Sequence, residues 1–598
     1  MIVYDLFVSN WVKIIPHKHT MITPYSFVAT QKLPDSLLDE MEMNDGPVFY
    51  DFYFPACPFE EELSREIGTR YICDSSFLET TGMFLQEWCE NDLECETPPY
   101  ESLQSRDDIQ QTFHETYPYF KVPDEVISVV DTYGSQFPWM KSYLASLDTL
   151  NHQPWFMRAW TSYTLGSPLL SLVTPIFFMI LPFFLLKLMR IQLTLQNYIV
   201  YLKKVMSGHT IGKLFQMKGS SITQKIYVLI SVGFYVMNTV RNVFDCIRFV
   251  KQQPTILTNV RTTCDDIAWI RSRVDSVLSR LTSVLTKKAH DAYEKYYHHL
   301  KDVKERMDGY KAYIDSIQDK LGSNTYPSFW TIGDSLSAFY RIHKDTDIQV
   351  LYDDMSDFLG YYQVITHVVS WCKKNTWTIV EWGKPWKIEE FSPIVMLDET
   401  LSSPVKNTVD MSLNWMITGP NASGKTTVLR SMLWNQILGQ QWGIMYASHA
   451  QSPIIDYFHC YLNVPDSYSR DSLFQAEARR CLEVLHFLEE HPDKQHFCIF
   501  DELYSGTNPV EATCGSIAYI QELQRKKNVR FMITTHYHDV VKYCKTIHKA
   551  YMMVQDTKYT YSLSDGVNRD YGATQVFKEL GYSDKFVNRI ERYIHKLG

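Results

Sequence analysis

A glycine-rich loop between an apolar strand and a helix constrains this chain more than any other feature. Residues 419–426 read Gly-Pro-Asn-Ala-Ser-Gly-Lys-Thr and follow the apolar run Trp415-Met416-Ile417. The spacing G-x-x-x-x-G-K-T predicts a strand that feeds a helix through a loop whose backbone N–H groups turn toward a nucleotide's β-phosphate. The positive N-terminal end of the helix adds to the same anion site.

Consecutive residues of this loop and of the following helix are the candidate nucleotide-binding set. They are Gly419, Pro420, Asn421, Ala422, Ser423, Gly424, Lys425, Thr426 and Thr427. We expect Lys425 to reach the β- and γ-phosphate oxygens and Thr426 to bind Mg²⁺. The ligands expected from this pattern are therefore ATP and Mg²⁺.

Two acidic residues stand at the end of a second apolar strand. Residues 497–500 form this strand, and Asp501 and Glu502 follow it directly. We expect Asp501 to bind Mg²⁺ through water while Glu502 polarises the attacking water. A third apolar run, residues 529–533, leads to His536, which could sense a γ-phosphate or act only as a structural hydrogen-bonding group. The expected catalytic residues are Glu502, His536 and Lys425.

The order of these motifs resembles the ATPase domain of the MutS mismatch-repair family. The resemblance covers about residues 390–598 and rests on the glycine-rich loop, on Asp501-Glu-Leu-Tyr-Ser-Gly-Thr507 and on Thr534-Thr-His-Tyr537. The family usually has Gly-Arg-Gly-Thr where this chain has Tyr504-Ser-Gly-Thr507, so the contacts of that loop are expected to differ.

One further segment bears on assembly. Ser472, Phe474 and Glu477 resemble the family's Ser-x-Phe-x-x-Glu segment. In the family, the matching serine touches the γ-phosphate bound by the other subunit. The resemblance therefore implies a homodimer in which Ser472 completes the partner's site.

A charge-free segment predicts contact with a membrane. No charged residue occurs from Ala159 to Leu186, and 15 of the 22 residues from Leu165 to Leu186 are strongly apolar. As a helix, residues 165–186 would run about 33 Å, which matches a hydrocarbon core of about 30 Å. The next stretch, residues 187–225, carries seven Lys or Arg residues and no Asp or Glu. Such a basic loop would lie on anionic lipid.

We therefore expect a hairpin that enters the membrane without crossing it and is kinked near Pro175. It would attach an intracellular protein to a membrane, with the ATPase domain on the cytoplasmic side. Twelve cysteines without a paired C-x-x-C spacing also indicate reduced thiols in an intracellular compartment. The alternative is a wholly soluble apolar helix in a large core.

Long helices are expected between this segment and the ATPase-like region. From Asp266 to Leu321, apolar residues recur at spacings of three and four, a pattern that needs partner helices. The MutS resemblance implies lever arms that connect a distal DNA clamp to the ATPase domain. Any long helical hairpin, however, would have the same pattern.

The expected architecture is an α/β P-loop NTPase of the ABC/MutS type, preceded by a long α-helical lever region and a hydrophobic helical segment. The expected ranges are an α+β N-terminal domain of unknown role at residues 1–150, hydrophobic helices at 151–250, the lever or clamp-like region at 251–389 and the ATPase domain at 390–598.

The leading hypothesis is a dimeric ATPase that hydrolyses ATP to drive a DNA clamp related to mismatch repair. The alternative is a membrane-tethered MutS-like ATPase that acts on other DNA structures or on protein partners. A transporter of the ABC type is disfavoured because no Leu-Ser-Gly-Gly-Gln signature occurs. The net charge of −10 at pH 7 means that any contact with DNA must come from a local basic patch.

Overall fold

The computed structural model describes residues 21–41, 43, 58–90, 149–188, 194–206, 222–321, 326–383, 385–393, 404–462, 473–555, 558–567, 577 and 581–597. The chain divides into two compact units. The first unit comprises Met1–Glu96, Val274–Asp302 and Asp354–Gly598, and the second comprises Thr97–Arg273 and Val303–Asp353. The ranges that the sequence suggested for four domains stay a prediction.

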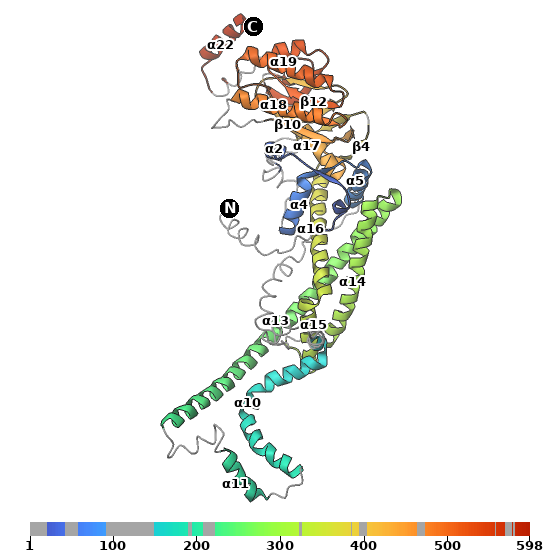
Figure 1. Ribbon diagram of the computed structural model, residues 1–598. Coiled ribbons are helices and arrows are strands. Elements are labelled where there is room, and N and C mark those ends of the chain that lie inside the picture. Colours follow the sequence, from blue (N-terminus) through green and yellow to red (C-terminus); the bar gives the residue numbers. More distant parts are fainter. Residues whose placement is uncertain are drawn as a thin grey trace. The chain divides into compact units, whose positions relative to one another are not determined.

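A six-stranded sheet with the order β10-β11-β12-β7-β13-β14 forms the core of the first unit (Figure 1). Its strands are β7 (Trp415–Thr418), β10 (Tyr457–Tyr461), β11 (His496–Phe500), β12 (Val529–Thr534), β13 (His548–Gln555) and β14 (Lys558–Asp565). All neighbouring pairs are parallel except β13 and β14. Every residue of β7 and β11 is buried, as expected for parallel strands that are covered on both faces.

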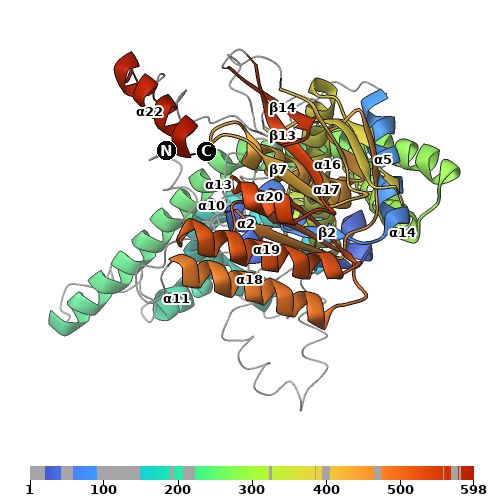
Figure 2. The ribbon, with the colours of Figure 1, turned by 90° about the horizontal axis from the view of Figure 1, so that it is seen from above.

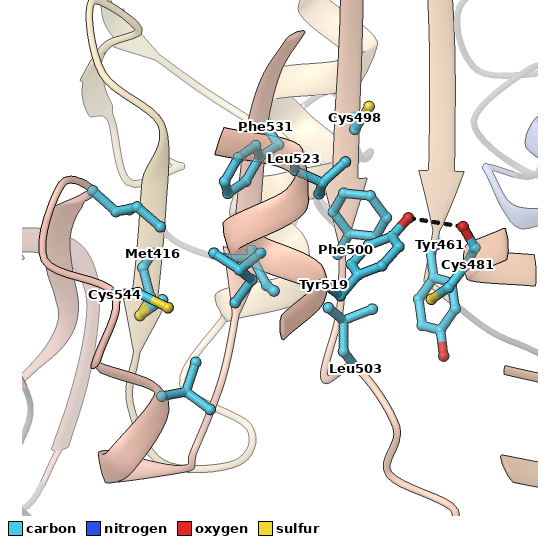
Figure 3. Close-up of a cluster of buried hydrophobic side chains, with 14 of the residues drawn as sticks. Met416, Tyr461, Cys481, Cys498, Phe500, Leu503, Tyr519, Leu523, Phe531 and Cys544 are labelled. Atoms are coloured by element: carbon cyan, nitrogen blue, oxygen red, sulfur yellow. Dashed lines mark hydrogen bonds between the residues drawn. The ribbon is translucent and has the colours of Figure 1, made fainter. Parts of the chain in front are cut away.

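Helices cover both faces of this sheet. On one face lie α18 (Leu473–Glu490), α19 (Pro509–Arg525) and α20 (His538–Tyr543), and Figure 2 shows α18 and α19 along the same side. They pack on the sheet through a buried cluster that includes Phe500, Phe531 and Leu523 (Figure 3). In the same cluster, the Tyr519 hydroxyl donates to the Cys481 carbonyl at 3.2 Å. The helix α17 (Lys425–Trp442) contacts the N-terminal elements α5 (Ser75–Glu90) and β2 (Arg70–Ile72).

Shorter elements complete the first unit. They are η1 (Pro24–Phe27), β1 (Thr30–Lys32), α2 (Asp35–Glu40), α4 (Pro58–Gly68) and α22 (Asp584–Leu597). A four-stranded sheet has the order β4-β9-β5-β6, and β3 pairs with β8. Their bounds are β3 (Thr378–Ile379), β4 (Glu381–Trp382), β5 (Lys387–Phe391), β6 (Asn407–Asp410), β8 (Ile444–Met445) and β9 (His449–Ser452).

The N-terminal residues are bound to α17 by buried amides. The Gln441 side chain donates to the carbonyls of Ile67, Gly68 and Arg70 at 3.0, 3.0 and 2.9 Å. The neighbouring Gln440 side chain donates to the Ile72 carbonyl at 3.1 Å. These bonds satisfy carbonyls at the end of α4 and in β2 that burial would otherwise leave without partners.

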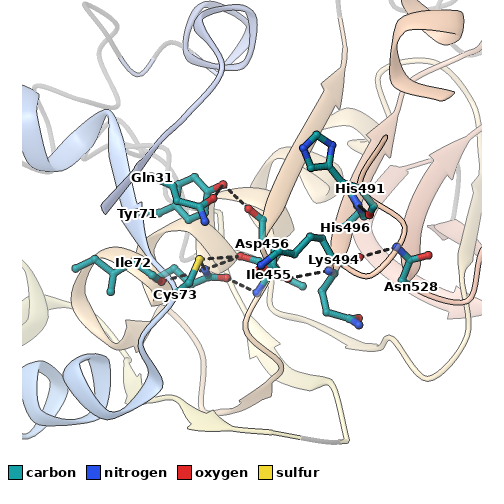
Figure 4. A network of polar contacts seen from close by, with 12 residues as sticks. Gln31, Tyr71, Ile72, Cys73, Ile455, Asp456, His491, Lys494, His496 and Asn528 are labelled. Atoms are coloured by element: carbon teal, nitrogen blue, oxygen red, sulfur yellow. Dashed lines mark hydrogen bonds and ion pairs between the residues drawn. The ribbon is translucent and has the colours of Figure 1, made fainter. Parts of the chain in front are cut away.

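A second polar network joins β2 to the segment before β10 (Figure 4). The Tyr71 hydroxyl lies 2.5 Å from the Asp456 carbonyl oxygen and 2.8 Å from Gln31 Oε1. The Asp456 carboxylate accepts from the Gln495 N–H at 2.8 Å and pairs with Lys494 at 3.1 Å. Residues before position 97 are therefore part of the same compact unit as the large sheet.

The second unit is built from helices. Its elements are η2 (Thr149–His152), α10 (Pro154–Leu188), α11 (Leu195–Met206) and α15 (Ile332–Lys344). Three longer helices contribute residues to both units: α13 (Ile222–Lys287), α14 (Asp291–Leu321) and α16 (Thr346–Lys374). The expected long helices are thus present, with a break at residues 288–290, and their role as levers stays a prediction.

The expected membrane attachment of residues 165–186 is wrong. In the described part of the chain, no helix is both long enough and apolar enough to cross a membrane. Hydroxyls of Ser167 and Ser171 donate to carbonyls of α10 itself at 2.9 and 2.7 Å, so the helix bonds these polar groups internally. Residues 189–193 and 207–221 of the expected basic loop lie outside the described residues.

A single glycine tests the packing of the N-terminal residues. Gly443 has φ +71°, and a Cβ there would lie 1.9 Å from the Leu78 carbonyl oxygen. We expect Gly443→Ala to destabilise the first unit by about 2 to 4 kcal/mol, because left-handed strain and a backbone clash add together. The readout is the midpoint of thermal unfolding.

Gly581→Ala is the matched control, because Gly581 has φ +81° and no heavy atom within 4 Å of an added Cβ. It should show the strain without the clash. Equal losses in the two variants would contradict the close approach of α5 to α17.

Candidate functional site

The glycine-rich loop connects a buried strand directly to a helix N-terminus. Strand β7 ends at Thr418 and α17 begins at Lys425. Gly424, the residue before α17, has φ +93°, and a Cβ there would lie 3.1 Å from the Tyr561 ring. Glycine is required at this position because both the backbone angle and the neighbouring ring exclude a larger residue. The loop residue Ala422 also has a positive φ, of 63°.

Lys425 is a buried cation at the centre of this loop, with an exposed fraction of 5%. Its Nζ donates to the carbonyls of Gly419 and Pro420, both at 3.1 Å. It also lies 3.6 Å from Glu502 Oε1. A buried ammonium needs such partners because burial removes its water.

Two threonine side chains from separate elements meet at Asp501. The Thr426 hydroxyl in α17 donates to Asp501 Oδ2 at 2.7 Å. The Thr534 hydroxyl at the end of β12 donates to Asp501 Oδ1. The same Thr534 hydroxyl accepts the backbone N–H of Glu502 at 3.2 Å. Thr534 therefore holds both acidic residues in place; in the sequence it was named only as the first residue of a motif and was given no role.

Glu502 lies between two basic side chains. His536 Nδ1 is 3.6 Å from Glu502 Oε2, and Lys425 approaches the other carboxylate oxygen. His536 and Lys425 hold the pKa of Glu502 below its ordinary value, against the opposing effect of partial burial. The backbone of Glu502 has φ 45°, an unusual angle for a residue with a side chain. Strained backbone of this kind is often found at functional sites.

A buried carboxylate fixes the loop that follows Glu502. Glu477 in α18 is 3% exposed and accepts from the N–H groups of Ser505 and Gly506, both at 3.1 Å. It also accepts from the Ser505 hydroxyl at 2.8 Å. The serine at position 505, where this chain departs from the usual family pattern, is thus bonded to Glu477.

The geometry brings most of the expected site residues together at one sheet edge. Lys425, Thr426, Asp501 and Glu502 are joined by the contacts above, and the half-exposed His536 lies beside Glu502. Ser472 lies outside the described residues. Sequence reasoning missed Tyr561, whose ring lies beside Gly424. The roles assigned to these residues stay predictions.

Comparisons with known proteins identify the C-terminal part of the chain. Residues 415–597 match the family model of MutS domain V. The "Endonuclease MutS2" of Clostridium perfringens (strain SM101 / Type A) is 26% identical over 207 residues, which are 34% of this chain and 26% of the relative. The "Endonuclease MutS2" of Streptococcus uberis is 28% identical over 200 residues, or 32% of this chain and 25% of the relative.

A third relative carries a different name. The "DNA mismatch repair protein MutS" of Haloquadratum walsbyi is 27% identical over 197 residues, or 31% of this chain and 21% of the relative. The chain thus spans about a quarter of the length of these curated relatives. The resemblance to the MutS family is confirmed for the C-terminal domain, which has the α/β P-loop fold.

The electrostatics of Glu502 predict a pH dependence of stability. Because the pKa of Glu502 is below its ordinary value of 4.5 in the folded protein, its pairing contributes fully at pH values above 4.5 and is lost as the pH falls through the lower folded value. We expect wild type to be more stable than Glu502→Gln at pH 7 and this difference to shrink by pH 4. Chemical denaturation at both pH values measures it. A difference that stays constant between pH 7 and pH 4 would contradict the assigned pairing.

Proposed function

From the premise that residues 415–597 form a MutS domain V, we propose that this protein binds and hydrolyses ATP. The observation that carries the proposal is the meeting of Lys425, Asp501 and Glu502 beside a loop that opens the N-terminus of α17. This arrangement offers backbone N–H groups and an ammonium to phosphate oxygens, and a carboxylate to the attacking water.

Mg²⁺ fits the residues present. The Thr426 hydroxyl and the Asp501 carboxylate converge at 2.7 Å, and hydroxyl and carboxylate oxygens are the ligands that Mg²⁺ prefers. When bound, Mg²⁺ would neutralise charge on the phosphates. The residues that would hold it are Thr426 directly and Asp501 through water.

The remaining residues divide the chemistry. Lys425, now bonded to carbonyls of its own loop, would exchange those bonds for β- and γ-phosphate oxygens. Glu502 would orient the attacking water, and its lowered pKa keeps it ionised and able to accept a proton. His536, at 3.6 Å from Glu502, would hold that carboxylate in position near the γ-phosphate.

Tyr561 in β14 is suited to contact the nucleotide base. Its ring lies 3.1 Å from the place of a Cβ on Gly424, and about half of the residue is exposed. Its φ of 57° shows that the backbone is held in a strained conformation. An exposed aromatic face at this position offers a stacking surface for a purine.

The proposal that this protein acts on DNA rests on its similarity to the relatives. The relatives are named for endonuclease activity and DNA mismatch repair, and family members act on DNA as dimers, so we propose a dimeric ATPase related to DNA repair. Helices α13, α14 and α16 would then serve as levers between the ATPase domain and a DNA clamp. Ser472 would complete the partner's nucleotide site. A gel-shift titration with homoduplex, mismatched and branched DNA tests this part of the proposal.

Two substitutions separate binding from turnover. We expect Glu502→Gln to bind ATP with unchanged affinity and to lose at least about a hundredfold in kcat, because only water activation is removed. We expect Lys425→Ala to weaken ATP binding as well, because it removes a phosphate contact. Fluorescent-nucleotide titration and steady-state phosphate release measure the two properties.

Glu511→Gln is the matched control, since Glu511 lies at the start of α19 and bonds to Thr507 rather than to the site. It should leave turnover unchanged. Hydrolysis at the wild-type rate by Glu502→Gln would remove the assignment of Glu502.

Tyr561 is tested through the KM for ATP. We expect Tyr561→Ala to raise this KM about 5- to 150-fold, because stacking on an aromatic ring contributes about 1 to 3 kcal/mol per base. Tyr561→Phe keeps the ring and should retain the wild-type KM. An unchanged KM in Tyr561→Ala would exclude a contact between Tyr561 and the base.

A further inference from the structure

Helix α13 carries two apolar seams that differ in their surroundings. In its C-terminal half, Val260, Ile267, Ile270 and Val277 are all at most 1% exposed. Its N-terminal half, from Ile222 to Val250, has an equally regular seam. The apolar side chains of that seam are between 40% and 77% exposed. One helix therefore has one seam that is covered and one that no described residue covers.

The exposed seam follows a strict heptad spacing of alternating four and three residues. One row contains Ile222, Leu229, Val236, Val243 and Val250. The alternate row contains Ile226, Gly233, Val240 and Ile247. These are the d and a positions of a heptad, respectively, and such a repeat specifies packing against another helix.

Polar residues lie on the side of the helix opposite the seam, although the exposed Phe234 occupies a b position between the two. The f positions, which point away from a coiled-coil partner, are all polar: Gln224, Ser231, Asn238 and Asp245. Arg241 and Arg248 occupy b positions, next to the f row, so these charges also lie outside the seam. Arg241 and Asp245 pair with each other at 3.9 Å along the outer face.

Helix α10 covers a different side of α13 and leaves the seam open. The Tyr235 hydroxyl donates to the Ser171 carbonyl at 2.7 Å, and Cys246 Sγ lies 3.9 Å from the Leu165 carbonyl oxygen. Tyr235 and Cys246 are at c and g positions, so α10 lies beside the seam. Helix α10 also has exposed apolar side chains of its own, including Leu170, Val173, Ile180 and Phe184.

We propose that the exposed seam of α13 is a self-association surface that packs against the same seam of a second copy of this chain. A twofold interface uses one patch twice, and a patch without charge at its a and d positions is compatible with itself. A standard interface buries about 800 Å² per partner, and the exposed apolar side chains of both α13 and α10 would contribute to such an area.

The geometry favours a four-helix arrangement, with α10 and α13 contributed by each copy. Apolar residues also occupy e positions next to the seam, at Ile230, Met237 and Phe244, and a stripe this wide suits a bundle better than a two-stranded coil. Gly233 lies within the seam with no heavy atom within 4 Å of an added Cβ. The inference goes beyond the proposed ATPase activity and does not depend on it.

The first test measures the mass of the nucleotide-free full chain by sedimentation velocity. Wild type is expected to be dimeric at micromolar concentration, and the double variant Val236→Asp, Val243→Asp is expected to dissociate at least about a hundredfold more readily, because it would bury charge at two d positions. Asn238→Asp places the same charge on the f row of the same helix and should keep the wild-type mass. Both seam positions are exposed in the single chain, so the double variant should keep its helical circular dichroism.

The second test excludes association through other parts of the chain. Leu229→Cys and Asn238→Cys are oxidised separately, each in the presence of native Cys246. If the helices pack in parallel through the seam, Leu229→Cys alone should give a covalent dimer. If they pack antiparallel, a mixture of Leu229→Cys and Val243→Cys should give one. In both cases the yield should exceed that of Asn238→Cys. Cross-linking equal to that of Asn238→Cys in both arrangements would overturn the proposal.

Two other outcomes would also overturn it. One is a wild-type chain that stays monomeric at tens of micromolar concentration. The other is a monomeric wild type that floats with phosphatidylcholine vesicles through residues of the seam. Phosphate release, measured on the same samples, keeps this result separate from the catalytic assignment: a monomeric chain that hydrolyses ATP refutes the seam and the proposed dimer but not the catalytic residues, and a seam-linked dimer without turnover refutes only the catalytic assignment.

Discussion

The in-register parallel pairing of β7, β12 and β11 is the constraint on which the site depends. Ile417 of β7 pairs with Thr534 of β12, and Ile533 of β12 pairs with Phe500 of β11. Because parallel strands end at the same edge, the glycine-rich loop, Asp501 and Thr534 meet within hydrogen-bonding distance. A slip of one residue would turn every side chain to the opposite face and separate Asp501 from Thr426.

The N-terminal residues and α17 depend on each other in a similar way. Helix α17 begins at the phosphate-binding loop. At its far end, the side chains of Gln440 and Gln441 donate to backbone carbonyls of residues 67–72, and Gly443, directly after the helix, lies against the backbone of Leu78. Glu40 adds a pairing with Arg480 of α18 and accepts the Leu462 N–H at 2.8 Å. The described residues of this region, 21–41, 43 and 58–90, thus hold the helix that carries Lys425, and damage to their packing is expected to reach the nucleotide site through α17.

The apolar residues of α13 recur with the same period in both halves of the helix, but they are buried in one half and exposed in the other. In the half that includes Ile267 and Val277, the period is matched by burial within the chain, as in an ordinary core. In the half that includes Val236 and Val243, the same period faces outward. A lack of charge near residues 165–186 suggested lipid as the partner of this region, but no helix in the described part of the chain is long and apolar enough to cross a membrane. The regular spacing, together with a polar outer row, indicates another helix instead.

The sequence by itself determined the C-terminal fold and the composition of the site. Three local motifs carry the site: the phosphate-binding loop, the acid pair after a buried strand and the third apolar strand. The residues within each motif are adjacent in the chain, so a local pattern identifies them. Sequence reasoning named Thr534 and Glu477 only as members of motifs, without a role, and did not name Tyr561. The contacts of all three depend on the fold: Thr534 bonds to Asp501, Glu477 bonds to Ser505, and Tyr561 lies beside Gly424. Only the tertiary structure decided that α5 and β2 contact α17 and that, among the described residues, the apolar seam in the N-terminal half of α13 is exposed. Burial and exposure depend on which surfaces the remote parts of the chain bring together, and no local pattern records that.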